Sequence, residues 1–320
     1  MADNLIRMQD RPCNCCGSTD RELIARGIDF EYETCANEFE FVRCRSCEHL
    51  YLNPLPDPSE LPIIYPSNYG NYASEKNDAL TYKVKNWLDR RYLRSLTEGM
   101  RVERVLDVGC ADGRMLALCR ETLPEVTDLE GIEFSPNVVE RARAEGFTVH
   151  VGSIDDLDLP PDHYDLVFLQ QVIEHVFDPT AVVRKLYRSL RTGGRVCFEM
   201  PTSEAIDRKF GEKRYWGGYH FPRHFNIFSE ASFGRICERA GFRVVRVAYR
   251  LQPVHWAWTV HHWLKEKGAP SAVYRVFNIQ NSFAIGWGTI MEGLALLATG
   301  RASNMQVLVE KVDAAPAAEA

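Results

Sequence analysis

Two pairs of cysteines near the start of the chain have the spacing of a metal site. Cys13 and Cys16 form the first Cys-x-x-Cys pair, and Cys44 and Cys47 form the second after 27 intervening residues. Each pair can turn two thiolates toward one point, and four thiolates make the closed tetrahedral set that Zn²⁺ prefers. A closed set leaves no coordination position for a substrate. The spacing therefore predicts a structural zinc in a small module over residues 1–52.

Unmetallated, partly buried cysteines are the alternative interpretation of this pattern. A module of about 45 residues can hardly bury enough apolar surface to fold unaided, which favours the metal. Cys15 and Cys35 are surplus to a set of four ligands, and Cys15 could replace one of its neighbours.

A second candidate site is the segment GGYHFPRHFNIFS, residues 217–229, which carries two histidines four positions apart. A helical zinc pair is disfavoured because Pro222 would lie in the helix interior and break it. Histidine suits proton transfer, since its ordinary pKa of about 6.5 leaves it mostly neutral at pH 7. We predict that His224 is a general base, assisted by His220 or Tyr219. The alternative is a set of structural histidines in an aromatic loop.

Strands and helices alternate along the part of the chain that must position these side chains. RVLDV at 104–108 predicts a short buried strand, and GCADG directly after it predicts a glycine turn that opens a helix. A second strand ends at Glu133, before a helix with Ser135 as its N-cap and Pro136 at its first position. Strand, glycine turn and helix in that order bring the backbone close to a ligand at a helix N-terminus.

Five more strands are predicted at FTVHVGS, YDLVFLQ, RVCFEM, FRVVRVAYR and MQVLVEKV. A helix between the second and third of these begins at Asp178-Pro179, has an apolar face that extends to Leu190, and closes at Gly193-Gly194. Ser229 caps another helix. This alternation predicts a mostly parallel sheet with helices on both faces.

The glycine turn and the acid that follows it indicate a nucleotide cofactor. Glu133 lies 24 residues after Gly109, at the end of the second strand, where a carboxylate accepts hydrogen bonds from ribose hydroxyls. The dinucleotide fingerprint needs a third glycine to admit a pyrophosphate, and Arg114 stands in its place. That departure disfavours NAD.

The ordered motifs resemble those of class I S-adenosylmethionine-dependent methyltransferases. LDVGCADG is similar to the first motif, GIEFSP to the second, VGSIDDLDLP to the third and YDLVFLQQVIEHVFDP to the fourth. RTGGRVCFEMP matches the region of the fifth strand and MQVLVEK the last strand. The resemblance covers roughly residues 100–250 and 304–312. It implies a Rossmann-like, doubly wound, mostly parallel seven-stranded sheet with an antiparallel last strand, and S-adenosylmethionine as the cofactor.

Carried over by position, the resemblance implies a cofactor site made of residues near the strand ends. These residues are Asp107, Gly109, Ala111, Gly113, Glu133, Phe134, Ser153, Ile154, Asp155, Gln170 and Gln171. Ala111 stands where the family usually has glycine and adds only a methyl group. Ser153 stands where the family often has an acid. Tyr69 and Tyr72, in the proline-rich connector, offer rings that could also contact the cofactor, or could serve packing alone.

The zinc module, the methyltransferase core and the histidine segment together resemble bacterial deoxysugar C-methyltransferases. In those enzymes this loop carries a Glu-His pair, and here Arg223 stands in place of the glutamate before His224. The departure leaves O-methylation open beside C-methylation. Arg223 could instead hold a phosphate or carboxylate of the acceptor, because its planar fork suits both. We expect Arg223, Glu174 and His175 to bind the acceptor, which the resemblance identifies as a sugar, sugar nucleotide or related intermediate.

The composition narrows the range of partners. A net charge of −6 and a pI near 5.9 give no electrostatic reason to expect a nucleic acid. The start of the chain has no apolar h-region, which predicts a cytoplasmic protein without disulfides. The apolar stretch Phe283–Thr299 is short for a bilayer span and contains Glu292, so no transmembrane span is expected.

The predicted division of the chain has six parts. The module at 1–52 is followed by a connector and helical lead-in at 53–100, the core at 101–250, an aromatic and apolar insertion at 251–303, the last strand at 304–312 and a disordered tail at 313–320. The insertion could be a lid, a dimer contact or a surface with weak membrane contact, so a monomer and a homodimer both stay open. A quinone or lipid-linked acceptor, and a catalytically silent cofactor-binding scaffold, are the alternative functions.

Overall fold

The structure, a computed structural model, describes residues 4–66 and 80–312. The chain divides into two compact units, each assembled from separated segments. The first unit consists of Met1–Tyr69, Met200–Phe233 and Val247–Gln306, and the second of Gly70–Glu199, Gly234–Arg246 and Val307–Ala320. This division differs from the linear one that the sequence predicts, because the segment 217–229 belongs to the same unit as the cysteine module.

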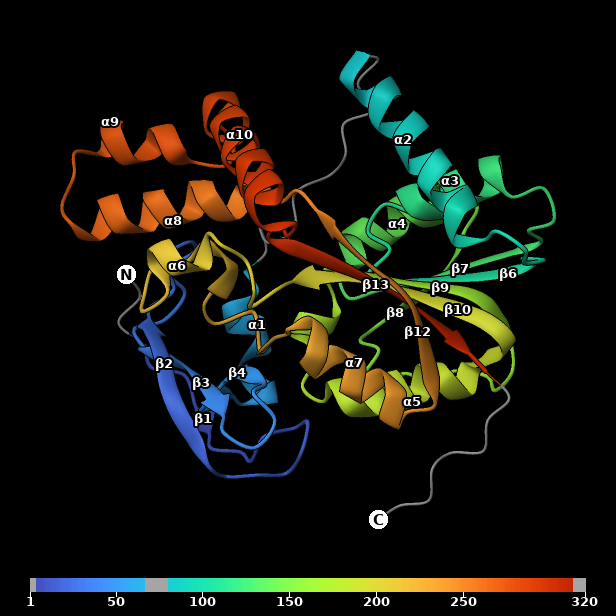
Figure 1. The fold of residues 1–320 in the computed structure, drawn as a ribbon, viewed down its shortest axis with the longest axis horizontal. Helices are drawn as coiled ribbons and strands as arrows, with labels where there is room; N and C mark the ends of the chain where they lie inside the picture. The colour runs from blue at the N-terminus through green and yellow to red at the C-terminus, as the bar shows by residue number, and fades with distance from the viewer. Residues whose placement is uncertain (1–3, 67–79, 313–320) are drawn as a thin grey trace. The chain divides into compact units, whose positions relative to one another are not determined.

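The second unit is built on a seven-stranded sheet in the order β12-β13-β10-β9-β6-β7-β8. Its strands are β6 (Arg104–Val108), β7 (Asp128–Glu133), β8 (Thr148–Val151), β9 (Tyr164–Gln170), β10 (Leu190–Pro201), β12 (Phe242–Arg250) and β13 (Asn304–Lys311). Strands β8, β7, β6, β9 and β10 pair in parallel. The arrow of β13 points opposite to those of β10 and β12 (Figure 1). The predicted fold class is confirmed.

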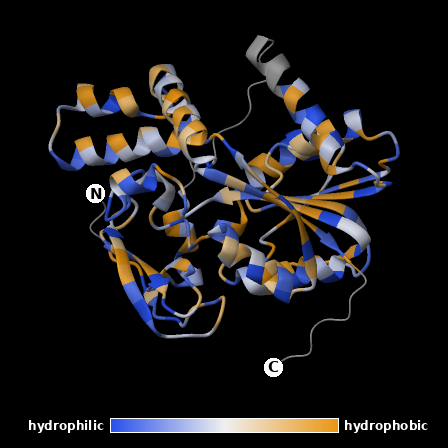
Figure 2. Ribbon diagram, viewed as in Figure 1, coloured by the Kyte–Doolittle hydropathy of each residue, from blue (hydrophilic) through white to orange (hydrophobic). Residues whose placement is uncertain are grey.

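Helices cover both faces of this sheet. They are α2 (Leu80–Leu96), α3 (Arg114–Thr122), α4 (Pro136–Ala144), α5 (Pro179–Ser189) and α7 (Glu230–Arg239). Helices α3 and α4 lie on one face, and α5 and α7 lie on the other (Figure 1). The core between the sheet and α3 includes fully buried Val105, Leu116 and Phe168. Hydrophobic residues dominate the strands, as expected for a sheet buried on both faces (Figure 2).

The helix starts follow the predicted capping residues. Ser135 is the N-cap of α4 with Pro136 after it, and Asp178 caps α5 by accepting a hydrogen bond from the N–H of Ala181 at 3.0 Å. The predicted end of α5 is wrong by several residues. Leu190 has extended backbone angles (φ −78°, ψ 147°) and begins β10, so the glycine pair lies inside a strand with a local irregularity.

The first unit contains a four-stranded sheet in the order β11-β4-β3-β2. Three strands come from the cysteine module: β2 (Arg21–Gly27), β3 (Phe39–Cys44) and β4 (Leu50–Leu52). The fourth, β11 (Asn226–Ile227), comes from the histidine segment and pairs antiparallel with β4. A two-stranded sheet of β1 (Met8–Gln9) and β5 (Leu55–Pro56), the 3-10 turn η1 (Pro58–Glu60) and the short α1 (Leu61–Ile64) complete the module.

The remaining elements of the first unit are helical. They are α6 (Arg208–Gly211), η3 (Gly217–Tyr219), α8 (Pro253–Glu266), α9 (Ser271–Tyr274), η4 (Arg275–Phe277) and α10 (Ser282–Thr299). Helix α10 packs along α8, where the indole N–H of Trp256 donates to buried Glu292 at 2.6 Å. Glu292 also accepts hydrogen bonds from the backbone N–H and the hydroxyl of Ser303, which fixes the end of α10 beside the start of β13.

Candidate cofactor and metal sites

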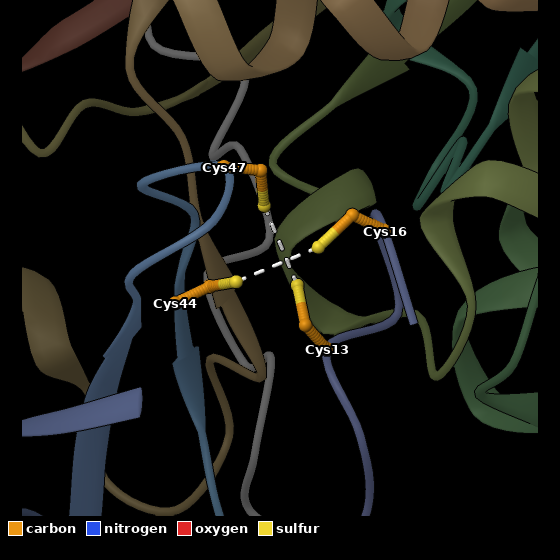
Figure 3. A group of neighbouring side chains, drawn as sticks. All are labelled: Cys13, Cys16, Cys44 and Cys47. Carbon is orange, nitrogen blue, oxygen red and sulfur yellow. Dashed lines mark hydrogen bonds between the residues drawn. The ribbon is translucent and has the colours of Figure 1, made fainter. Parts of the chain in front are cut away.

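The four predicted cysteine ligands converge on one point in the first unit (Figure 3). The Sγ atoms of Cys13, Cys16, Cys44 and Cys47 all lie within 4.8 Å of one another. Cys13 Sγ is 3.6 Å from Cys47 Sγ, and Cys16 Sγ is 3.5 Å from Cys44 Sγ. Disulfide sulfurs lie only about 2 Å apart, whereas ligands 2.3 Å from a tetrahedral Zn²⁺ lie about 3.8 Å from one another. The donor set therefore fits zinc.

The backbone around the second pair favours ionised sulfur. Burial opposes ionisation of Cys44, but backbone N–H groups of Cys47 and Ser46 outweigh it and lower the pKa of that thiol to about 7. Burial and the neighbouring Cys16 raise the pKa of Cys47. A bound cation would remove the mutual repulsion of the four thiolates. The Cys15 thiol donates a hydrogen bond to Asn14 Oδ1 at 3.6 Å, and Cys15 is not in the four-sulfur group.

The two Cys-x-x-Cys turns, here called knuckles, contact the histidine segment 217–229 through buried Asn226. Asn226 Oδ1 accepts a hydrogen bond from Asn14 Nδ2 at 2.9 Å and lies 3.1 Å from His49 Nε2. Burial lowers the pKa of His49 to about 4, so its imidazole is neutral at pH 7. Because Asn14 lies between Cys13 and Cys16 and His49 lies two residues after Cys47, the four-cysteine group and the segment 217–229 share one hydrogen-bonded network.

His220 is paired with a carboxylate from the cysteine module. His220 Nδ1 lies 2.5 Å from Glu31 Oε2, and the Glu31 side chain is 4% exposed. Burial alone would raise the pKa of Glu31, but the charges and hydrogen bonding of His220, together with His262 and Arg223, hold it below its ordinary value. A carboxylate at Nδ1 fixes the tautomer that has its lone pair on Nε2. Glu31 was not predicted from the sequence.

Arg223 is fully buried and bonds within the protein. Its guanidinium makes two hydrogen bonds to Asp29, at 3.0 and 2.9 Å, and Nε donates to the carbonyl of Ile64 at 2.7 Å. It also lies 4.3 Å from the ring centroid of Tyr32. No part of either charged side chain is exposed. These bonds occupy the planar fork that was expected to hold the acceptor, so we correct that prediction and assign Arg223 to positioning the segment.

His224 and Tyr219 differ in what their polar atoms can do. His224 Nδ1 lies 2.8 Å from the carbonyl oxygen of Gly218, which requires the proton on Nδ1 and leaves the lone pair on Nε2. The Tyr219 hydroxyl donates to the carbonyl of Glu212 at 2.5 Å, and burial raises its pKa. The ring of Tyr219 is fully buried against Phe41. Tyr219 therefore suits a structural position better than the predicted assisting role in proton transfer.

The cofactor residues of the second unit begin at the glycine turn after β6. Gly109 has φ +75°, and a Cβ there would meet Val172 Cγ2 at 2.5 Å. Gly113, the N-cap of α3, has φ +82°, and a Cβ there would meet the Phe147 ring at 2.8 Å. Both positions combine a left-handed backbone with close packing, so only glycine fits them. Ala111 also has a positive φ, +47°, but its side chain is exposed and tolerates the methyl group.

Glu133 is held rigidly at the end of β7. Its Oε2 accepts a hydrogen bond from the N–H of Ala111 at 3.0 Å, and its Oε1 accepts one from the N–H of Ser135 at 2.9 Å. The carboxylate thus joins the glycine turn to the start of α4 and retains lone pairs for ribose hydroxyls. Phe134, next along the chain, is 56% exposed, as a ring that covers a ligand would be before binding.

The loop after β8 carries the residues predicted at the adenine. Ser153 Oγ lies 3.2 Å from Asp155 Oδ2, and Ile154 is buried. Lys185 Nζ donates to the carbonyls of Ile154 at 2.7 Å and Asp155 at 3.1 Å, which ties the loop to α5. Burial raises the pKa of Asp155.

The loop after β9 contains buried polar atoms that have no partner among the described residues. They are Gln171 Nε2 and both carboxylate oxygens of Glu174. Gln171 adopts a positive φ of 57° and donates its N–H to the carbonyl of Glu199 at 2.8 Å. Burial raises the pKa of Glu174 to about 8, so the carboxyl is protonated at pH 7. Orphaned buried polar atoms are costly and mark places where a ligand completes the hydrogen bonding.

The other predicted residues of this part of the chain are placed as follows. Gln170 ends β9, and His175 ends the 3-10 turn η2 (Ile173–His175); both are partly buried. Tyr69 and Tyr72 lie outside the described residues.

The features of the cofactor site gather at one edge of the sheet. The glycine turn, the Glu133 carboxylate and the orphaned atoms of the β9 loop all lie at the carboxyl ends of parallel strands. This is the arrangement of proteins that bind a nucleotide-containing cofactor. These residues fit S-adenosylmethionine.

Comparison with known proteins agrees with that class. Residues 80–247 match the family model described as "Methyltransferase domain". The ubiquinone biosynthesis O-methyltransferase of Pseudomonas savastanoi pv. phaseolicola is 32% identical over 117 residues, 35% of this chain and 48% of that protein. The malonyl-[acyl-carrier protein] O-methyltransferase of Serratia marcescens is 29% identical over 128 residues, 39% of this chain and 48% of that protein. The chain spans about half the length of these curated relatives.

A solved S-adenosylmethionine-dependent methyltransferase from Archaeoglobus fulgidus has 18% sequence identity and a TM-score of 0.47, over 72% of this chain and 94% of that one. Because the family model covers more than half of the chain, the chain belongs to the methyltransferase-domain family.

The ionisation state of Asp107 in the cofactor site leads to a testable prediction. Burial, with a smaller effect from nearby Glu133, raises the pKa of Asp107 to about 8, so its carboxyl is mostly protonated at pH 7 without ligand. Binding of a cationic ligand at the glycine turn favours the carboxylate, so we expect up to one proton to be released on binding S-adenosylmethionine. Calorimetry at pH 7 in two buffers of different ionisation enthalpy measures this release. Asp107→Asn is expected to abolish it, and a wild-type binding heat that does not depend on the buffer would contradict it.

Proposed function

We propose that this protein transfers the methyl group of S-adenosylmethionine to a hydroxyl of a small molecule. The observation that carries the proposal is the cofactor site of the second unit, in which Gly109, Gly113 and Glu133 hold a fixed geometry beside the orphaned polar atoms of Gln171 and Glu174. Membership of the methyltransferase-domain family supports it. The two curated relatives, both named as O-methyltransferases, support it as well.

The reaction is an in-line displacement. S-adenosylmethionine supplies a methyl group on a sulfonium. The acceptor oxygen forms a bond to the methyl carbon, the carbon–sulfur bond breaks with its electron pair going to sulfur, and the hydroxyl proton moves to a base. We assign this base to His224, because the Gly218 carbonyl at Nδ1 leaves the proton-accepting lone pair on Nε2. Protonated Glu174 can donate a hydrogen bond to a neutral acceptor, which suits a sugar hydroxyl or carbonyl.

His224→Ala tests the assignment of the base. We expect kcat to fall by about 10²–10⁴-fold, the usual contribution of a general base, while the affinity for S-adenosylhomocysteine stays within a few-fold. Rates are measured on sugar nucleotides and on hydroxylated aromatic acceptors, with binding followed by calorimetry. His150→Ala, which removes an exposed histidine, is the matched control. Unchanged turnover in His224→Ala would remove this residue from catalysis, and cofactor binding without turnover on any acceptor would favour a scaffold.

Glu31 enters this proposal as a positioning residue for His220. If the pair supports proton transfer, Glu31→Gln lowers kcat and moves the acidic limb of the pH–rate profile, while KM changes little. A purely structural role would lower stability and leave the shape of that profile intact. Comparison of Glu31→Gln with His220→Ala thus separates the two roles, since both variants should show the same profile if the carboxylate acts through this imidazole.

A hydrophobic acceptor, such as a quinone or lipid-linked molecule, is the second candidate. The observation in its favour is the exposed apolar face of α10, where Phe283, Ile290, Leu294 and Leu297 are 57–85% exposed. One curated relative is named for ubiquinone biosynthesis. Activity that rises when the acceptor is presented in vesicles would favour this class over a sugar.

A further inference from the structure

Helix α10 exposes four large apolar side chains on the surface of the first unit. Phe283, Ile290, Leu294 and Leu297 are 60%, 64%, 57% and 85% exposed. At 3.6 residues per turn these four positions fall within an arc of about 60° and form one stripe along the helix. The 18-residue helix has a mean hydropathy of 1.3, and only 22% of it is buried. Figure 2 shows hydrophobic residues along its length.

The opposite face of α10 is made of small residues packed against the protein. Ala284, Gly288 and Ala295 are buried there, and a Cβ on Gly288 would meet the carbonyl oxygen of Pro253 in α8 at 2.5 Å. A surface helix of a globular protein normally turns its large apolar residues inward. In α10 only some large apolar residues, such as Trp287, are partly buried, whereas the four of the stripe face outward. The stripe therefore contributes little to the core and forms an exposed apolar surface of the kind that marks an interaction site.

The charges around the stripe favour one kind of partner. Within α10, all of whose residues are described, the one charged side chain is Glu292, and it is fully buried. Residues 251–303 contain four basic residues (Lys265, Lys267, Arg275 and Arg301) and two acidic ones (Glu266 and Glu292), and Lys265 and Arg301 are paired with Glu33 and Glu204 from other parts of the chain. Lys267 and Arg275 are exposed, and Trp263 on α8 is 47% exposed.

We propose that α10 docks this protein on an anionic lipid surface, lying in the plane of the membrane interface with its Phe283–Leu297 stripe in contact with the acyl chains. The stripe itself is leucine, isoleucine and phenylalanine, and the preceding segment, from α8 to η4, exposes Trp263, Lys267 and Arg275; these are the residue types of an interfacial anchor. Exposed Lys267 and Arg275 would attract anionic headgroups, and the apolar stripe would supply the contact that salt does not screen.

A transmembrane span is a weaker interpretation of the same helix. By length and composition α10 is the one helix among the described residues that could cross a bilayer, which is weak support for a span. To do so it would have to leave α8 and lose the hydrogen bonds of Glu292 to Trp256 and Ser303. Strand β13 begins at Asn304, a few residues after the helix, and holds that end in the sheet.

Vesicle flotation of the full chain tests the proposal without any need for methyl transfer. The probes are vesicles of phosphatidylcholine alone and of phosphatidylcholine mixed with anionic phosphatidylglycerol. We expect the protein to float with the mixed vesicles and to bind the neutral ones less. Leu294→Ser/Leu297→Ser removes two large groups of the stripe and is expected to lower partitioning about tenfold or more. Lys267→Glu/Arg275→Glu is expected to remove the preference for the anionic lipid.

Leu5→Ser/Leu23→Ser is the matched control, because it changes two leucines that are 74% and 47% exposed in the cysteine module. It should float like the wild type, and all variants should retain binding of S-adenosylhomocysteine by calorimetry as proof of folding. Absence of wild-type flotation with either vesicle, or equal flotation of the stripe variant, would overturn the proposal. A second result would also overturn it: the wild type does not bind vesicles and sediments as a dimer, whereas the stripe variant sediments as a monomer. The stripe would then contact a second copy of this chain.

Discussion

If the four sulfurs hold zinc, replacing Cys44 by serine is expected to release the metal and unfold the cysteine module. Three thiolates and a hydroxyl bind zinc far more weakly than four thiolates, and small metal-binding modules commonly depend on their metal for folding. We expect a loss on the order of 5 kcal/mol or more in the free energy of unfolding of the first unit. Metal content by plasma mass spectrometry, and urea unfolding of wild type and variant, measure the two effects.

Cys44→Ser is also expected to affect the segment 217–229, outside the cysteine module. Asn226 of β11 bonds Asn14 in the first knuckle and His49 beside the second, and β11 pairs with β4. Loss of the knuckles should therefore disorder the segment 217–229 and raise its amide hydrogen exchange. Cys15→Ser is the matched control, since Cys15 lies between two ligands and outside the four-sulfur group. Retention of zinc and of wild-type stability by Cys44→Ser would show that the four sulfurs are not a metal site.

The sequence predicted well those features that depend on neighbouring residues. The glycine turn at Gly109, the acid at Glu133 and the caps Ser135 and Asp178 are local patterns, in which the backbone conformation is set within a few residues. The pairs of cysteines are also local, and only the closure of the two pairs onto one point depends on the sheet. The seven-stranded, mostly parallel sheet could be predicted because it follows from a resemblance over the whole series of motifs.

The features that the sequence did not predict depend on partners far apart in the chain. Arg223 was expected to bind the acceptor, and its partner Asp29 is 194 residues away. Glu31, the partner of His220, lies in the cysteine module and was assigned no function. The sequence held one signal: GIDFEYETC places three acids at alternate positions, with an aromatic residue between each two, an arrangement that burial tolerates only when each carboxylate has a cationic or hydrogen-bonding partner.

Arg223→Leu is expected to lower the free energy of unfolding by about 3–5 kcal/mol, because it leaves a buried carboxylate without its cation. Burial alone would raise the pKa of Asp29, but Arg223 and the hydrogen bonds from Thr34 bring it to about 2. This depressed pKa stabilises the fold above the ordinary aspartate pKa of about 3.9, and the contribution is lost as the pH falls through about 2. In Arg223→Leu, burial without the cation would raise the pKa of Asp29 and let this carboxyl become protonated in mild acid, which relieves the buried charge. Urea unfolding at pH 7 and at pH 4 should therefore show the difference between wild type and Arg223→Leu shrinking toward acid.

Two further variants separate the buried ion pair from charge in general. Arg26→Leu removes the guanidinium of an exposed pair, whose Nε lies 2.8 Å from Glu40, and is expected to cost at most about 1 kcal/mol. Adding Asp29→Asn to Arg223→Leu should recover part of the loss, because a neutral amide removes the buried charge and keeps one of the two acceptor oxygens that now bind the N–H groups of Tyr32 and Thr34. If Arg223→Leu costs no more than Arg26→Leu and instead weakens acceptor binding, the guanidinium belongs to the acceptor after all. The buried geometry argues for the opposite result: this arginine and Asp29 join the histidine segment to the cysteine module.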